Sequence, residues 1–181
     1  DVTQNYSKTF NDLRYTQTLR MNEMSKDQIT MLGTFAKGFQ VENSKITQLL
    51  DRTIALTGKA SVDTFLEISH LSKAVADETG VDYKNISQMI IELRTDVEKF
   101  GNVHNDAAAR IAGALNQIGV SYQGFSGMIG RFQGFDSAAS SLGNLTTLFG
   151  VHFDAMEMMM LANEDQEEFL YRMEYKLDDF Y

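Results

Sequence analysis

The chain has 181 residues, a net charge of −9, and no proline, cysteine or tryptophan. Turns and edge strands use proline, whereas helix interiors exclude it, so its absence favours helices joined by short glycine turns. The absence of cysteine excludes disulfides, thiolate nucleophiles and cysteine-ligated metals. The negative charge opposes direct binding to nucleic acid, which usually requires a basic face. We therefore expect an all-α protein that does not contact nucleic acid directly.

Residues 1–57 predict an extended, coiled-coil-like helical region. Residues 3–24 carry only a thin apolar stripe at helical spacing. Ser25 and Gln28 match a capping box, which predicts that a second helix begins near Lys26. From there apolar residues recur every three or four positions, as in a heptad repeat.

This heptad-like seam is the candidate surface for association between copies of the chain. Its main residues are Ile29, Leu32, Phe39, Ile46 and Leu50. Burying them around a symmetry axis would remove apolar surface from water, so we expect a homo-oligomer. Two glycines and the polar Asn43 interrupt the pattern. The alternative is a break at residues 41–44 that gives two shorter helices.

Residues 58–162 predict a bundle of short helices separated by glycine turns. Gly58 suits the left-handed position that ends a helix, and Ser61 is placed to cap the next helix. Amphipathic helices are expected over residues 62–79 and from beyond Gly80 to Phe100. Their expected buried residues are Phe65, Ile68, Leu71 and Val75, followed by Ile86, Ile90, Leu93 and Val97.

An internal repeat follows Gly80, Gly119 and Gly150, because apolar residues occur at the same five offsets after each glycine. These residues are Val81, Tyr83, Ile86, Met89 and Ile90; Val120, Tyr122, Phe125, Met128 and Ile129; and Val151, Phe153, Met156, Met159 and Met160. The pattern predicts a helix end with glycine at positive φ, followed at once by a helix start. The expected N-cap residues are Asp82, Ser121 and His152. Common capping chemistry explains the repeat as well as common descent does.

Residues 111–153 are poor in charge. Arg131 and Asp136 are the only charged residues there, and eight of the chain's 13 glycines lie in this stretch. Burial between closely packed helices explains this composition. A transient contact with a membrane is the alternative.

Residues 163–181 predict a C-terminal amphipathic helix. Asn163 is its expected cap, and the acids that follow suit a first helical turn because the helix macrodipole favours them there. The same macrodipole explains the acidic run at residues 164–168 without a bound cation. The expected buried residues are Phe169, Leu170, Met173 and Leu177.

No pattern in the sequence predicts catalysis, a metal or a cofactor. His104 and Asp106 are two positions apart and would not face each other on a helix. The group of His152, Asp154 and Glu157 matches no zinc or calcium spacing. The methionines within residues 156–160 instead suit an adaptable docking surface of flexible thioethers. We expect a structural or binding protein and not an enzyme.

The last third of the chain carries a family resemblance. Its residues are Phe135-Asp136-Ser137-Ala138-Ala139, Leu145, Phe149-Gly150-Val151, Asp154-Ala155-Met156 and Leu161-Ala162-Asn163-Glu164-Asp165. This segment resembles helical segments of bacteriophage tail tape-measure proteins and related interior virion proteins. The resemblance implies a long helical protein inside the phage tail, commonly a trimer near the tip, that sets tail length and is expelled at infection. Its implied partners are copies of itself and other tail proteins.

The resemblance transfers no functional residue, because such proteins have no invariant signature. Two other functions stay open: a membrane-active helical translocator or effector region, and a helical adaptor that binds protein partners. The chain begins at Asp1 without an initiator methionine or a signal peptide, so we expect a piece of a longer protein. The short helices after residue 57 suit a terminal or tip-proximal region of a tape-measure protein better than its central rod.

Overall fold

The computed structural model describes residues 24–101, 103–149 and 152–178, which form ten α-helices and no strand. The helices are α2 (Lys26–Phe39), α3 (Asn43–Thr57), α4 (Asp63–Thr79), α5 (Tyr83–Thr95), α6 (Val97–Phe100), α7 (Asn105–Gln117), α8 (Tyr122–Phe132), α9 (Phe135–Phe149), α10 (Ala155–Glu164) and α11 (Gln166–Asp178). The all-α prediction is confirmed. The thin apolar stripe expected before Met24 lies outside the described residues.

The region with the heptad-like seam forms two short helices, which was the alternative expectation. The α2 helix begins at the predicted capping box, where the Gln28 N–H donates to the Ser25 hydroxyl at 3.2 Å and the Ser25 N–H donates to Gln28 Oε1 at 2.8 Å. It ends at Gln40, whose φ of 56° is left-handed. The Val41 N–H then closes the last turn on the Ala36 carbonyl at 2.8 Å. One continuous coiled-coil helix is therefore wrong for residues 26–57.

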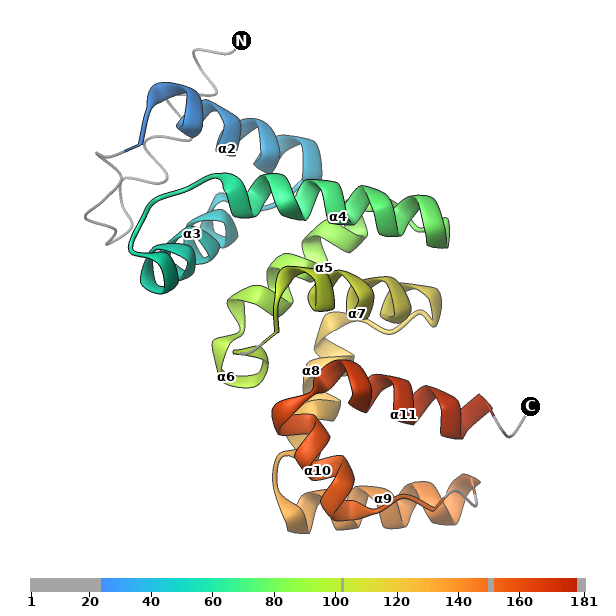
Figure 1. Ribbon diagram of the computed structural model, residues 1–181. Coiled ribbons are helices and arrows are strands. Elements are labelled where there is room, and N and C mark those ends of the chain that lie inside the picture. The colour runs from blue at the N-terminus through green and yellow to red at the C-terminus, as the bar shows by residue number, and fades with distance from the viewer. Residues whose placement is uncertain (1–23, 102, 150–151, 179–181) are drawn as a thin grey trace.

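The α5 helix lies at the centre of the larger, N-terminal part of the fold, where it packs against α2, α3, α4 and α7 (Figure 1). Its buried residues are Ile86, Ser87, Met89, Ile90, Ile91 and Leu93. Close packing of α4 on α7 depends on Gly113, because a Cβ there would lie 2.6 Å from Val75 Cγ1.

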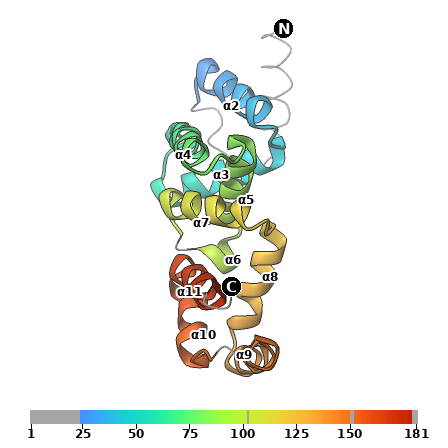
Figure 2. The ribbon, with the colours of Figure 1, turned by 90° about the vertical axis from the view of Figure 1, so that its right-hand side faces the viewer.

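The helices α8 to α11 form a second layer that attaches to the first through α5, α6 and α7. In Figure 2 this layer and the α2 helix lie at opposite ends of an elongated molecule. Stacked rings of Phe100 and Phe125, with centroids 5.6 Å apart, join α6 to α8. Phe132 and Phe169 pack edge to face at 5.1 Å and join α8 to α11.

The glycine turns agree with the repeat where the structure describes them. Gly58, Gly80 and Gly119 have φ of 72°, 73° and 71°, in the left-handed region. The Asp82 carboxylate accepts the Lys84 N–H, and the Ser121 hydroxyl accepts the Gly124 N–H, so both predicted N-caps are confirmed. Gly150 lies outside the described residues.

Three predicted boundaries are wrong, and an aspartate explains each. Asp96 interrupts the helix expected to reach Phe100, because its carboxylate caps α6 by accepting the Lys99 N–H at 3.2 Å. Asp154, rather than His152, caps α10 and accepts two backbone N–H groups. Asp165, rather than Asn163, caps α11 and accepts the Glu168 N–H at 3.0 Å. A carboxylate is a strong N-cap acceptor that also favours the positive end of the helix macrodipole.

Burial accounts for only part of the charge-poor segment. Its buried apolar residues within the described ranges are Ile111, Ala112, Leu115, Phe125, Ile129, Phe132, Ala138 and Leu142. By contrast, α9 presents exposed but uncharged residues such as Ser140 and Asn144 to water. Across the described residues, none of the helices is both long enough and apolar enough to cross a membrane.

We expect Gly80→Ala to lower the free energy of unfolding by about 1 kcal/mol or more, because alanine is strained at positive φ. Its Cβ would meet nothing within 4 Å, so the cost would come from the backbone alone. Gly127→Ala is the matched control, since Gly127 lies inside α8 with equally open space. That change should raise stability by about 0.5–1 kcal/mol. Urea denaturation followed by circular dichroism measures both, and equal shifts of the same sign would contradict the assigned turn.

Candidate functional site

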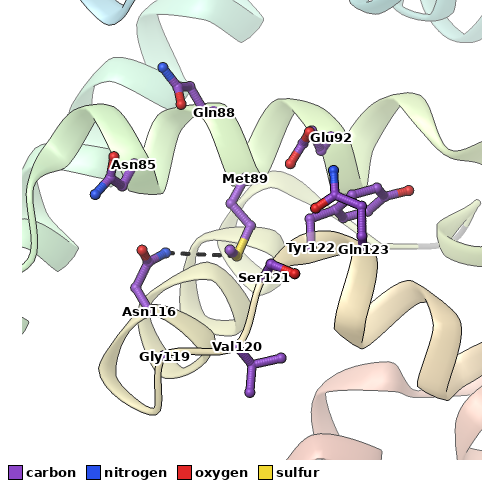
Figure 3. Close-up of a pocket in the computed structure, with 10 residues that line it drawn as sticks. All are labelled: Asn85, Gln88, Met89, Glu92, Asn116, Gly119, Val120, Ser121, Tyr122 and Gln123. Carbon is purple, nitrogen blue, oxygen red and sulfur yellow. Dashed lines mark hydrogen bonds between the residues drawn. The ribbon is translucent and has the colours of Figure 1, made fainter.

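A pocket of about 350 Å³ opens where the turn between α7 and α8 meets α5 (Figure 3). Its lining residues are Asn85, Gln88, Met89, Glu92, Asn116, Gly119, Val120, Ser121, Tyr122 and Gln123. The α5 residues Asn85, Gln88 and Glu92 are spaced three and four apart, so they share one helix face. That face is polar, although six of the 13 residues of α5 are buried, and it forms one wall of the pocket.

Two amide side chains of the pocket have their N–H donors bound within the protein. Gln88 Nε2 donates to the carbonyl oxygens of Phe39 and Gln40 at 3.1 and 3.2 Å, which ties α5 to the end of α2. Asn116 Nδ2 donates to the Ala112 carbonyl at 2.8 Å and contacts Met89 Sδ at 3.7 Å (Figure 3). Each amide is thereby fixed in orientation and keeps its carbonyl oxygen as an acceptor.

Tyr122 and Asp96 form a polar contact beside the pocket. The Tyr122 hydroxyl donates to Asp96 Oδ2 at 2.5 Å, and the Ser126 hydroxyl lies 3.5 Å from the same oxygen. Burial, followed by this hydrogen bond, raises the pKa of Tyr122 well above its usual range. Lys99 Nζ donates to Ser126 Oγ at 2.8 Å. Asp96 is therefore a well-satisfied carboxylate, and the tyrosine stays protonated.

Glu92 is in the opposite situation, although it lies only one helical turn before Asp96. Burial raises the pKa of Glu92, and the positive charge of Lys45 offsets this effect only in part. Across the residues that the structure describes, no hydrogen bond or ion pair involves its carboxylate. Within the described part of the chain, Glu92 has therefore lost water on folding and gained only the charge of Lys45 in return.

A second polar cluster holds helices together beneath the surface. Arg52 of α3 donates to the backbone carbonyls of Arg94 and Gly101, and Arg94 donates to the Val103 carbonyl. Burial lowers the pKa of both arginines. Asn105 donates to Glu67 at 2.7 Å, which links α7 to α4. These donors satisfy carbonyls where α5 and α6 end, so the cluster has a structural role.

A smaller pocket of about 220 Å³ separates the start of α7 from the start of α11. Arg110 spans it with two bonds to Glu167, at 2.5 and 2.9 Å, and contacts Asp106 at 3.4 Å. His104 lies exposed at the α7 N-cap. Asp106 thus pairs with Arg110 and orients no histidine. Among the described residues, no group of three potential ligands could hold a metal ion.

The seam residues lie inside the chain's own core. Ile29, Leu32, Ile46 and Leu50 are at most 2% exposed, and Phe39 is partly buried against Phe35 with ring centroids 4.4 Å apart. They cover neighbouring helices of one chain, so association through this seam would require them to leave the core. In the methionine cluster, Met156 and Met160 are half exposed while Met158 is buried.

Sequence reasoning missed the main pocket. The only signal was the polar face of α5, which looks in sequence like any solvated helix face. Comparison with models of known protein families, with curated protein sequences and with solved structures finds no match. What the chain does must therefore be inferred from its own residues.

We expect Glu92→Gln to raise the free energy of unfolding at pH 7 by a few tenths of a kcal/mol, about the scale of partly screened charges. Burial raises the folded-state pKa above the unfolded value of about 4.3. The charged carboxylate therefore destabilises the fold above that raised pKa, and the penalty disappears as the pH falls through it.

Urea denaturation of the parent chain and of Glu92→Gln at pH 7 and pH 4 measures the difference in their free energies of unfolding. This difference should shrink at the lower pH. Glu78→Gln, at an exposed position of α4, is the control and should show no such pH dependence. A Glu92→Gln variant that is less stable than the parent at pH 7 would mean that Glu92 has a partner.

Proposed function

We propose that this chain is a structural, non-enzymatic part of a phage tail interior, a tape-measure-like segment that contributes to tail length and is expelled at infection. One observation carries the proposal. Most of the described residues with the family resemblance fall in α9 and α10, with Asp154 and Asp165 capping the ends of α10, and these two helices pack against each other and against α8. The resemblance therefore covers one packed structural unit rather than scattered positions.

The surface of that unit supports a role in assembly. Beyond the exposed Asp136 in its first turn, the exposed residues of α9 include Ala139, Ser140, Gly143 and Asn144, which carry no charge. Met156 and Met160 project from the next helix at i and i+4, half exposed. Small uncharged side chains allow close approach, and flexible thioethers adapt to a partner's shape. We propose that copies of the chain, as a trimer, and other tail proteins are contacted here and not through the buried seam.

A helical protein-binding adaptor is the second candidate. The observation that favours it is the burial of Ile29, Leu32, Ile46 and Leu50 within one chain. A chain that covers its own apolar seam has less need of identical copies.

Purified particles of the phage that encodes the chain test the tail-interior proposal. We expect the chain to be present by mass spectrometry, protected from added protease in intact tails, and lost from the particles after DNA ejection. The major capsid protein serves as the control that stays with the particle. Absence of the chain from purified particles, with its presence in infected cells, would overturn the proposal and favour the adaptor.

Sedimentation equilibrium of the chain at high micromolar concentration tests self-association. We expect oligomers that dissociate when Met156 and Met160 are both changed to serine, because polar side chains would weaken an apolar contact there. The same change at the exposed Leu66 of α4 is the control for general loss of apolar surface. A monomer at every concentration would contradict self-association through α10.

A further inference from the structure

We propose that the pocket on α5 binds a guanidinium or alkylammonium group. This inference goes beyond the tail-interior role and does not depend on it. Its described lining residues include one carboxylate, Glu92, and several amide and hydroxyl oxygens, and none of them is basic. The charge of the lining therefore favours a ligand that is positively charged and carries hydrogen-bond donors.

Gln88 and Asn116 present their oxygens for further bonding, because their N–H groups are already bound within the protein. Gln88 donates to two backbone carbonyls, whereas Asn116 donates to the Ala112 carbonyl and contacts Met89 Sδ. The Tyr122 hydroxyl donates its hydrogen bond to Asp96 and keeps lone pairs as acceptors. Guanidinium and alkylammonium groups carry several N–H donors and no acceptor, which is the complementary set.

The negative charge of the pocket also favours a cation. Glu92 lines the pocket as a half-buried carboxylate with no described hydrogen-bond or ion partner. Asp96 places a second negative charge one helical turn away, and the whole chain carries a net charge of −9. A neutral ligand would leave the Glu92 charge balanced only in part by Lys45, whereas an organic cation would form charge-assisted hydrogen bonds with it.

The size and the lining of the pocket suit the same kind of ligand. A volume of about 350 Å³ holds a group the size of a long side chain. Met89 supplies an apolar contact for the methylene stem of such a group (Figure 3). A single carboxylate with neutral amides suits this ligand better than a divalent cation, which draws on several charged oxygens.

Because burial disfavours the charged form of Glu92, we expect this residue to lower the stability of the fold at neutral pH. A cation bound in the pocket would favour that charged form. Stability and binding should therefore respond to Glu92→Gln in opposite directions. Substitution of a residue with a structural role would reduce both stability and binding.

The test is an NMR titration of the 181-residue chain at low salt with N-acetyl-arginine amide. We expect shifts confined to backbone amides of residues 85–92 and 119–123. N-acetyl-citrulline amide is the matched probe, because its urea has the same shape and no charge, and it should bind at least about tenfold more weakly. The absence of localised shifts at millimolar concentration, or equal binding of citrulline, would overturn the proposal.

Two variants of the pocket should change the affinity for arginine amide in opposite directions. Glu92→Gln should weaken arginine amide binding roughly tenfold while the chain stays folded, and Gln123→Glu at the pocket rim should tighten it several-fold. Glu78→Gln removes one negative charge at an exposed position of α4 and should change binding little. If Glu78→Gln weakens binding as much as Glu92→Gln does, the effect is non-specific attraction and the site is refuted.

The same titration identifies the source of the cation. Methylguanidinium represents a free small cation, and the tripeptide Gly-Arg-Gly represents a side chain presented by a protein. Tighter binding of the tripeptide would assign the site to a basic side chain of a partner, and equal binding would assign it to a small cation. Both results support the cation site, and failure of all the probes refutes it. Either way, the presence of the chain in phage tails is decided separately.

Discussion

The burial of α5 on all but one face is the constraint on which the rest of the structure depends. Residues such as Ile86, Ile90 and Leu93 occupy one side and Ile91 another, so that helices must surround α5 before its apolar surface leaves water. The helices α2, α3, α4 and α7 do so. The polar face of α5 is not covered by these helices. The turn between α7 and α8 packs beside it, and the two together form the pocket.

Two carboxylates at the end of this helix show how neighbouring positions acquire different roles. Asp96 receives the Tyr122 hydroxyl and the Lys99 N–H, and it also starts α6. Glu92, four residues earlier, faces the pocket without such partners. Their surroundings separate them, since Asp96 accepts hydrogen bonds from two neighbours whereas burial raises the pKa of Glu92. Only the second has capacity for a ligand.

Local capping chemistry is the part of the fold that the sequence predicts well. Ser25, Asp82 and Ser121 cap helices as expected, because each acts on backbone groups within three residues. The end of α2 was harder to predict, since Gln40 takes a left-handed conformation that usually belongs to glycine. The seam shows a deeper limit. Spacing of three and four describes an apolar helix face equally well whether it meets its own chain or a copy.

The pocket could not be predicted for a related reason. Asn85, Gln88 and Glu92 are visible as a polar face, but their meaning depends on Asn116 and the turn at Gly119 packing beside them. That placement follows from the approach of α7 to α4 and α5, to which Gly113 contributes by carrying no side chain. Contacts between segments far apart in the sequence form the site, and the periodicity of a single segment does not predict those contacts.

The order in which the helices pack has a consequence for the speed of folding. Contacts join near neighbours along the chain, such as α4 with α5, α5 with α7, α8 with α9, and α9 with α10. Chains dominated by such short loops reach the native state fast, because little closure entropy precedes the first stabilising contacts. The pairs α4 with α5, α8 with α9 and α9 with α10 can therefore form early, whereas the contacts of α4 with α7 and of α7 with α11 must wait for segments farther apart in the chain to meet.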